Sequence, residues 1–162
     1  MKAIQITAPF QAEITEVPKP ELTAPDDVII RVTSGGICGS DIGIYNGTNS
    51  LATYPRLIGH EFGGIVESVG PAVTGIKPGS QAAVDPVISC GKCYACRASR
   101  HNVCRNLEVM GVHRDGGFAE YAGPFWQSQL PGCAGSALHS RGTADAPGGR
   151  PGLDGGRGQG PC

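Results

Sequence analysis

The chain has 162 residues, with 13 lysines and arginines against 14 aspartates and glutamates, so its formal net charge is −1. This length predicts one domain, or one domain with an appendage, and the near-neutral charge argues against nucleic acid or a membrane surface as a partner. The amino terminus is too polar for a signal peptide and no apolar run reaches transmembrane length, which predicts a cytoplasmic location.

The first half of the chain predicts short β-strands separated by turns. Stretches rich in valine and isoleucine occupy residues 2–6, 28–33, 62–69 and 81–84, and proline, glycine and aspartate lie between them. Many short strands with such turns favour a barrel or a sandwich. The only helix that we expect is a short one over residues 38–45, with Ser40 and Asp41 capping its first turn.

Two segments in this half carry possible metal ligands. Cys38 lies in a glycine-flanked turn, and His60 and Glu61 follow Gly59 immediately before the third strand. Taken singly, a buried cysteine is usually an inert apolar residue and a histidine a structural hydrogen-bonding residue. Together they predict a metal site with few protein ligands and an open position for water or substrate.

A second group of ligands has a stronger pattern. Cys90, Cys93, Cys96 and Cys104 form C-x2-C-x2-C-x7-C, the spacing of a closed tetrahedral zinc site. A bacterial ferredoxin-type cluster would need a gap of three residues and a following proline, whereas here the gap is seven and Arg105 follows. A disulfide framework is the other alternative, which a reducing cytoplasm disfavours. His101 lies in the same loop and is expected to be solvated.

A last strand is expected over residues 118–122, where the composition changes abruptly. Residues 123–162 contain eleven glycines and five prolines, and no isoleucine, valine, lysine, glutamate, methionine, tyrosine or asparagine. Such a segment buries too little apolar surface to offset the entropy of ordering it. We therefore expect a domain over residues 1–122, incomplete at its C-terminal end, and a disordered tail over 123–162. A shifted reading frame is our hypothesis for the origin of this tail.

Three motifs in this order resemble the medium-chain family of zinc-dependent alcohol dehydrogenases. Gly59-His60-Glu61 with Gly64, Gly70 and Val73 resembles its zinc signature, Cys38-Gly39-Ser40-Asp41 its first ligand segment, and the cysteine quartet its structural zinc loop. The resemblance covers residues 1–122. It implies a mainly β, GroES-like barrel with a structural zinc lobe, which in the family precedes a Rossmann domain that binds NAD or NADP.

The resemblance also implies roles for individual residues. Cys38 and His60 would be ligands of a catalytic zinc, and Glu61 a direct or exchanging ligand, as in the polyol and sugar-acid branch. Ser40 would relay the alcohol proton, and Asp41 would orient His60. The cysteine quartet would hold a second, structural zinc. The substrate would be a small alcohol or polyol that gives hydride to NAD(P), in a family whose members are usually homo-oligomers.

The sequence also departs from this family. Gly43 stands where many members have a histidine that serves proton exit, and the chain has no G-x-G-x-x-G motif, so we expect no Rossmann domain and no cofactor-binding residue within it. In the tail, Asp145 and Cys133 have no surroundings that would make them ligands. His113 lies in a stretch resembling the one that closes the structural lobe, or it is a surface turn residue.

Three functions follow as hypotheses. The first is the catalytic domain of a zinc-dependent alcohol or polyol dehydrogenase, inactive by itself for lack of a dinucleotide-binding domain. The second is a truncated, catalytically silent zinc-binding fragment. The third is a zinc module for contact with protein or nucleic acid, which the absence of a basic stripe disfavours.

Overall fold

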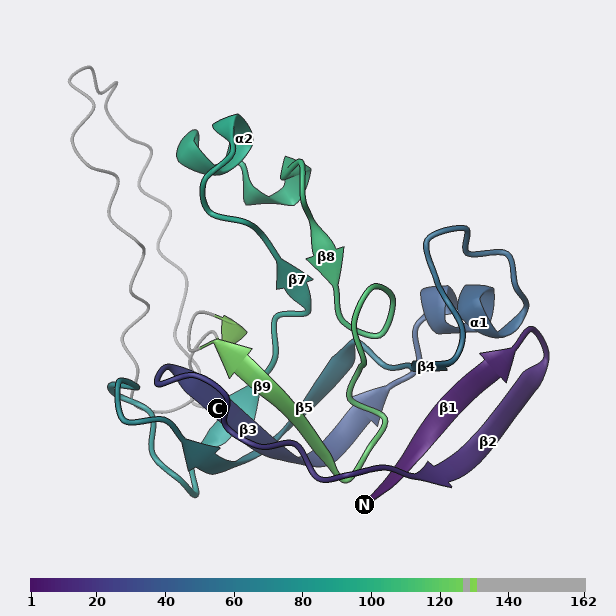
Figure 1. Cartoon of the computed structure of the whole chain (residues 1–162), viewed down its shortest axis with the longest axis horizontal. Helices are drawn as coiled ribbons and strands as arrows, with labels where there is room; N and C mark the ends of the chain where they lie inside the picture. The colour runs from purple at the N-terminus through teal and green to yellow at the C-terminus, as the bar shows by residue number, and fades with distance from the viewer. Residues whose placement is uncertain (127–128, 131–162) are drawn as a thin grey trace, which may run out of the picture.

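The computed structural model describes residues 1–126, 129 and 130, and it is built mainly of β-strands (Figure 1). The described strands form a three-stranded sheet, a four-stranded sheet and a two-stranded ribbon. The helical segments in this part of the chain are α1, Gly39–Tyr45, α2, Tyr94–Arg97, and one 3-10 turn, His101–Val103. None of them has the length and apolar character that crossing a bilayer requires.

The smaller sheet has the strand order β2-β1-β4, formed by Gln11–Glu16, Lys2–Ala8 and Arg56–Leu57. All pairs in it are antiparallel. β1 buries Ala3 and Ile6. β2 is almost wholly exposed, because nothing in the described part of the chain covers it.

The larger sheet has the strand order β6-β5-β3-β9, formed by Gln81–Ala83, Glu61–Val69, Asp27–Gly36 and Tyr121–Trp126. Its pairs are also antiparallel. Val28, Ile30, Phe62, Val66 and Phe125 form the centre of its buried apolar cluster. The second half of β3 emerges from this core, and residues 33–36 are exposed.

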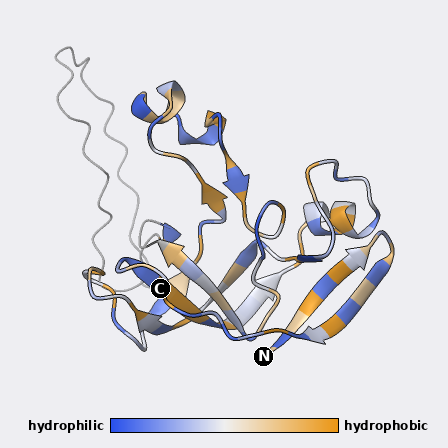
Figure 2. Cartoon of the chain, in the orientation of Figure 1, coloured by the Kyte–Doolittle hydropathy of each residue, from blue (hydrophilic) through white to orange (hydrophobic). Residues whose placement is uncertain are grey.

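The two-stranded ribbon extends from the sheets and carries the cysteine quartet. β7 (Val87–Ile88) pairs with β8 (Glu108–Val109), and α2 and the 3-10 turn lie between them at the tip (Figure 1). β7 is apolar and β8 begins with the polar Glu108 (Figure 2). Of residues 87–109, only Ile88, Cys96 and Cys104 are buried apolar residues, so this ribbon has little core of its own. We call residues 87–109 the cysteine lobe.

The expected strands at 2–6, 28–33, 62–69 and 81–84 are confirmed by β1, β3, β5 and β6. The expected strand at 118–122 begins too early. β9 starts at Tyr121, whereas Phe118 and Ala119 pair with β1. Of the two residues expected to cap α1, Asp41 is confirmed and Ser40 is wrong. Cys38 is the N-cap, and Asp41 Oδ2 accepts its backbone N–H at 2.8 Å.

The boundary expected at residue 122 falls inside β9, which continues to Trp126. Phe125 is completely buried in the larger cluster, and Leu130 is buried with it, so both belong to the packed domain. The expectation for the remainder of the tail, residues 127–128 and 131–162, lies outside the described residues.

Candidate metal centres

Four thiols converge at the tip of the cysteine lobe. The sulfur atoms of Cys90, Cys93, Cys96 and Cys104 all lie within 4.8 Å of one another. Cys93 Sγ is 3.5 Å from Cys96 Sγ and 3.9 Å from Cys104 Sγ. Tetrahedral zinc with bonds of about 2.3 Å separates its sulfurs by about 3.8 Å, whereas a disulfide requires about 2.05 Å. The spacing therefore fits a metal site and excludes disulfides among these four residues.

Backbone N–H groups make the lobe favourable for thiolates. The N–H groups of Arg105 and then Cys96 lower the pKa of the Cys93 thiol to about 6, and the N–H of Lys92 lowers the pKa of Cys90. Burial acts in the opposite direction on Cys96 and raises its pKa to about 11. These donors are peptide groups, so a motif of side chains could not reveal them. They provide the hydrogen bonds that a bound thiolate needs.

A second group of ligand atoms forms where β3, α1 and β5 meet. Cys38 precedes α1, and His60 and Glu61 stand at the start of β5. The antiparallel register pairs Gly36 with Glu61, which brings the two segments together although they are distant in sequence. One ligand atom from each of Cys38, His60 and Glu61 lies within 4.8 Å of the others. We call these three residues the open cluster.

The imidazole of His60 is held between two polar side chains. Its Nδ1 lies 3.2 Å from Asp41 Oδ1, and its Nε2 lies 3.1 Å from Ser40 Oγ. Asp41 is 2% exposed. The Nδ1 and Oδ1 atoms are not aligned as a hydrogen bond, and neither has another partner in the described structure. Both are buried polar atoms without a hydrogen bond, and each is the other's polar neighbour at 3.2 Å.

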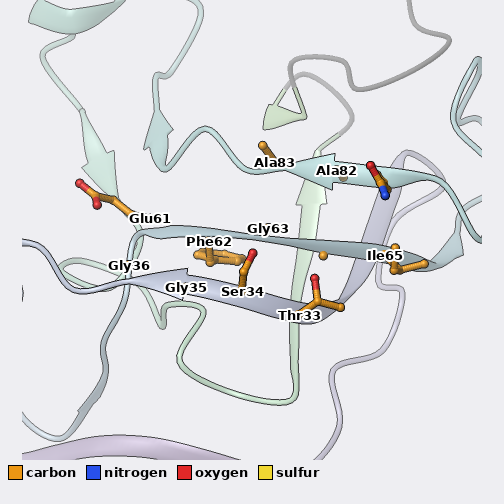
Figure 3. Close-up of a pocket in the computed structure, with 12 residues that line it drawn as sticks. Thr33, Ser34, Gly35, Gly36, Glu61, Phe62, Gly63, Ile65, Ala82 and Ala83 are labelled. Atoms are coloured by element: carbon orange, nitrogen blue, oxygen red, sulfur yellow. The ribbon is translucent and has the colours of Figure 1, made fainter. Parts of the chain in front are cut away.

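A hollow of about 480 Å³ adjoins the open cluster, and Figure 3 shows it from one side. The end of β3 and the start of β5 pair there. Four of the lining residues are glycines, whose lack of side chains leaves the space open: Gly35, Gly36, Gly63 and Gly64. The Glu61 carboxylate points away from the strands at one end (Figure 3). Glu61 belongs to both the hollow and the open cluster, whereas Cys38 and His60 do not line the hollow.

The structure places the two other histidines of its described part outside both clusters. His101 is exposed, and its Nδ1 lies 3.2 Å from Ser89 Oγ. His113 Nδ1 accepts the backbone N–H of Val109 at 3.0 Å and so closes a turn, a contact that fits both interpretations of this residue. Among the described residues, no further cluster of three or more metal-ligating groups is found.

Comparison with known proteins gives a consistent result. Residues 24–128 match the family described as the alcohol dehydrogenase GroES-like domain. The starvation-sensing protein RspB of Escherichia coli is 51% identical over 122 residues, and L-threonine 3-dehydrogenase of Pyrococcus abyssi is 45% identical over 128. Each alignment covers 75% of this chain and 36% of the relative.

A solved structure agrees in fold as well as in sequence. The crystal structure of RspB from Escherichia coli in complex with NADH superimposes with a TM-score of 0.74 at 47% identity, covering 80% of this chain and 37% of that one. The chain thus spans about a third of the length of the relatives that it matches.

Proposed function

The chain belongs to the alcohol dehydrogenase GroES-like domain family, and on this premise we propose that it is the zinc-binding part of an enzyme that oxidises a secondary alcohol with NAD or NADP. Two of its relatives support this assignment: one is named for dehydrogenation at carbon 3 of threonine, and the other binds NADH. Because the chain spans about a third of their length, the activity is proposed for the whole protein.

The observation that carries the proposal is the convergence of Cys38, His60 and Glu61. A thiolate, an imidazole and a carboxylate are all ligands that Zn²⁺ accepts, and their two negative charges balance its charge. Three protein ligands leave one position for an alcohol oxygen. The buried Asp41 fits this role, since metal-bound histidines donate their other ring N–H to a carboxylate.

Bound zinc would supply Lewis acidity that lowers the pKa of an alcohol and favours hydride loss to nicotinamide. The remaining work falls to this chain's side chains. The Asp41 carboxylate, whose Oδ1 lies 3.2 Å from His60 Nδ1, would hold the ring proton on that nitrogen and so leave Nε2 as the ligand atom. Ser40 Oγ, which lies 3.1 Å from that nitrogen, stands on the ligand side of the ring, where its hydroxyl can accept the alcohol proton.

We propose that the cysteine lobe holds a second zinc with a structural role. Four thiolates fill the coordination sphere, so no position is left for substrate. The lobe has little apolar core, and structural zinc contributes roughly 10 kcal/mol or more to the folding of such segments. Metal binding therefore replaces packing in this part of the chain.

We further propose that this chain alone does not turn over substrate. It contains no G-x-G-x-x-G motif, so it has no recognisable phosphate-binding turn for a dinucleotide. A catalytically silent zinc-binding protein is the second candidate function, and the lack of a G-x-G-x-x-G motif in this sequence is the observation that favours it.

Metal analysis of matched variants tests the proposal. The wild-type chain should hold two zinc ions, and Cys38→Ser and Cys93→Ser should each hold one, lost from different sites. Reduction of NAD or NADP with secondary alcohols should be undetectable. If Cys38→Ser retained the wild-type zinc content, the open cluster would not be a metal site. Robust turnover by the chain alone would contradict the assignment of hydride transfer to the whole protein.

A further inference from the structure

We propose that Phe118 is a positioning residue that sets the separation of the two segments of the open cluster. Its ring lies between the end of β3 and the turn before β5, and it therefore acts on Cys38 and His60 without being a ligand. The inference rests on the proposed function, because the property that Phe118 controls is metal binding at that cluster.

The ring of Phe118 touches backbone on both sides. A Cβ placed on Gly59, the residue before His60, would overlap the ring, with the ring Cγ only 2.6 Å away. A Cβ placed on Gly35, three residues before Cys38, would lie 3.1 Å from the ring Cε1. Only glycines allow an aromatic ring to approach both segments this closely. The ring thus occupies the space between them.

Gly59 also has a conformation that needs support. Its φ of +95° is rare for residues with side chains, and glycine keeps such a φ only where its surroundings specify it. The direction in which the His60 side chain leaves the backbone depends on this turn. Packing of the Phe118 ring against Gly59 restricts the other backbone conformations that a glycine can adopt.

Phe118 is itself fixed at its backbone. Its N–H donates to Ile58 O at 3.0 Å, and its carbonyl accepts the N–H of Ile4 at 2.8 Å. The preceding residues continue the attachment, since Gly117 N–H donates to Gly59 O and Gly116 N–H to Leu57 O, both at 2.8 Å. The ring is therefore presented from a segment tied to β1 on one side and to residues 57–59 on the other.

A further anchor lies at Asp115. Its Oδ1 accepts the backbone N–H of Leu57 and an Arg56 N–H, each at 3.2 Å. The Asp115 side chain is 61% exposed, so this ion pair stabilises the attachment only weakly. We therefore assign the positioning of His60 to the Phe118 ring rather than to this ion pair.

Shortening the side chain should loosen the cluster selectively. Phe118→Leu leaves a gap between Gly35 and Gly59, and ligand positions must be accurate within about 0.2 Å for zinc. Loss of residues that orient a ligand typically costs 10- to 100-fold in metal affinity. We expect Phe118→Leu to weaken cobalt(II) and zinc at the open cluster about 10-fold and Phe118→Ala to weaken them further, while the cysteine lobe stays unchanged.

Phe125→Leu is the matched control. Phe125 is completely buried in the larger core, where its ring packs against Phe62 with the ring centroids 5.9 Å apart. This substitution should lower the free energy of unfolding at least as much as Phe118→Leu does, since Phe118 is only partly buried. It should leave both metal affinities unchanged.

The test is a cobalt(II) and zinc competition titration of the wild type and the three variants, with urea unfolding in parallel. The cysteine lobe serves as the internal reference in every sample. Selective loss at the open cluster, seen for Phe118 variants and not for Phe125→Leu, supports the proposal. Equal weakening of both sites, or the same loss in Phe125→Leu, would make Phe118 merely structural and overturn it. A wild type that binds metal in the lobe alone would instead overturn the proposed function, and this inference with it.

Discussion

The cysteine lobe and the open cluster gather ligands in different ways. The lobe takes its thiols from one stretch, with Cys90 and Cys104 only 14 residues apart, and the local chain brings them together. The open cluster joins the end of β3 to the start of β5, and it exists only if those strands pair in the observed register. One site is thus a local property of the chain, and the other is a property of the folded sheet.

The largest expected effect comes from removing one ligand of the local site. Cys93→Ser should abolish zinc binding in the lobe and make backbone amides of residues 90–104 exchange rapidly with solvent, because metal replaces packing there. Hydrogen exchange followed by mass spectrometry measures this. Protection of β3 and β5 should remain.

Tyr94→Ala is the control for this substitution. Tyr94 is adjacent to Cys93 and is 83% exposed, so replacing it removes no buried contact of note. The Tyr94→Ala variant should keep the zinc of its cysteine lobe and the protection of the lobe's backbone amides against hydrogen exchange. If Cys93→Ser kept a protected lobe, the metal would not be what stabilises that part of the chain.

The next largest effect is expected at the open cluster. His60→Ala should lose one zinc per chain and leave the lobe's zinc in place, with little change in overall fold, because β5 is held by its pairing with β3 and β6. Metal content and far-ultraviolet circular dichroism together measure this. Loss of both ions would show that the two sites are not independent.

A smaller effect is expected from the buried carboxylate. Asp41→Asn should weaken zinc at the open cluster about 10- to 100-fold, because the group that faces His60 Nδ1 and accepts the Cys38 N–H loses its negative charge. A chelator competition titration measures it. An affinity equal to that of the wild type would exclude a role for Asp41 in orienting the imidazole.

The smallest effect is expected from His101→Ala. His101 lies within the cysteine lobe but is exposed, and four thiols already suffice for tetrahedral coordination. Zinc content should stay at two ions per chain. A drop to one would mean that the histidine replaces one of the cysteines as a ligand.

The difference between the two regions also explains what could be predicted from the sequence. Four cysteines at fixed spacing predict their own convergence. β3 and β5 predict strands because valine and isoleucine recur in both, and part of each strand is buried: residues 27–30 of β3, and every second residue from Phe62 to Val66 of β5. β2 escaped prediction since it has no buried face, and the short β4, β7 and β8 have too few residues for a pattern. The position of Phe118 against Gly59 depends on tertiary contacts that no local motif encodes.

The C-terminal end of the described domain also could not be predicted from local sequence. The composition changes after residue 122, which predicted the boundary there, yet β9 continues through the change. Pairing with β3 and burial of Phe125 hold it in place despite a glycine and a proline within the strand. Tertiary burial here outweighs local preference.

X-ray absorption at the zinc edge tests the central claim most directly, since it counts sulfur ligands per ion. The account predicts two zinc ions that share five thiolates, four in the lobe and one at Cys38, which gives about 2.5 sulfurs per zinc on average. His60→Ala should raise this average to about 4, as the lobe alone remains filled. A wild-type sample with one zinc and four sulfurs would contradict a metal site at the open cluster.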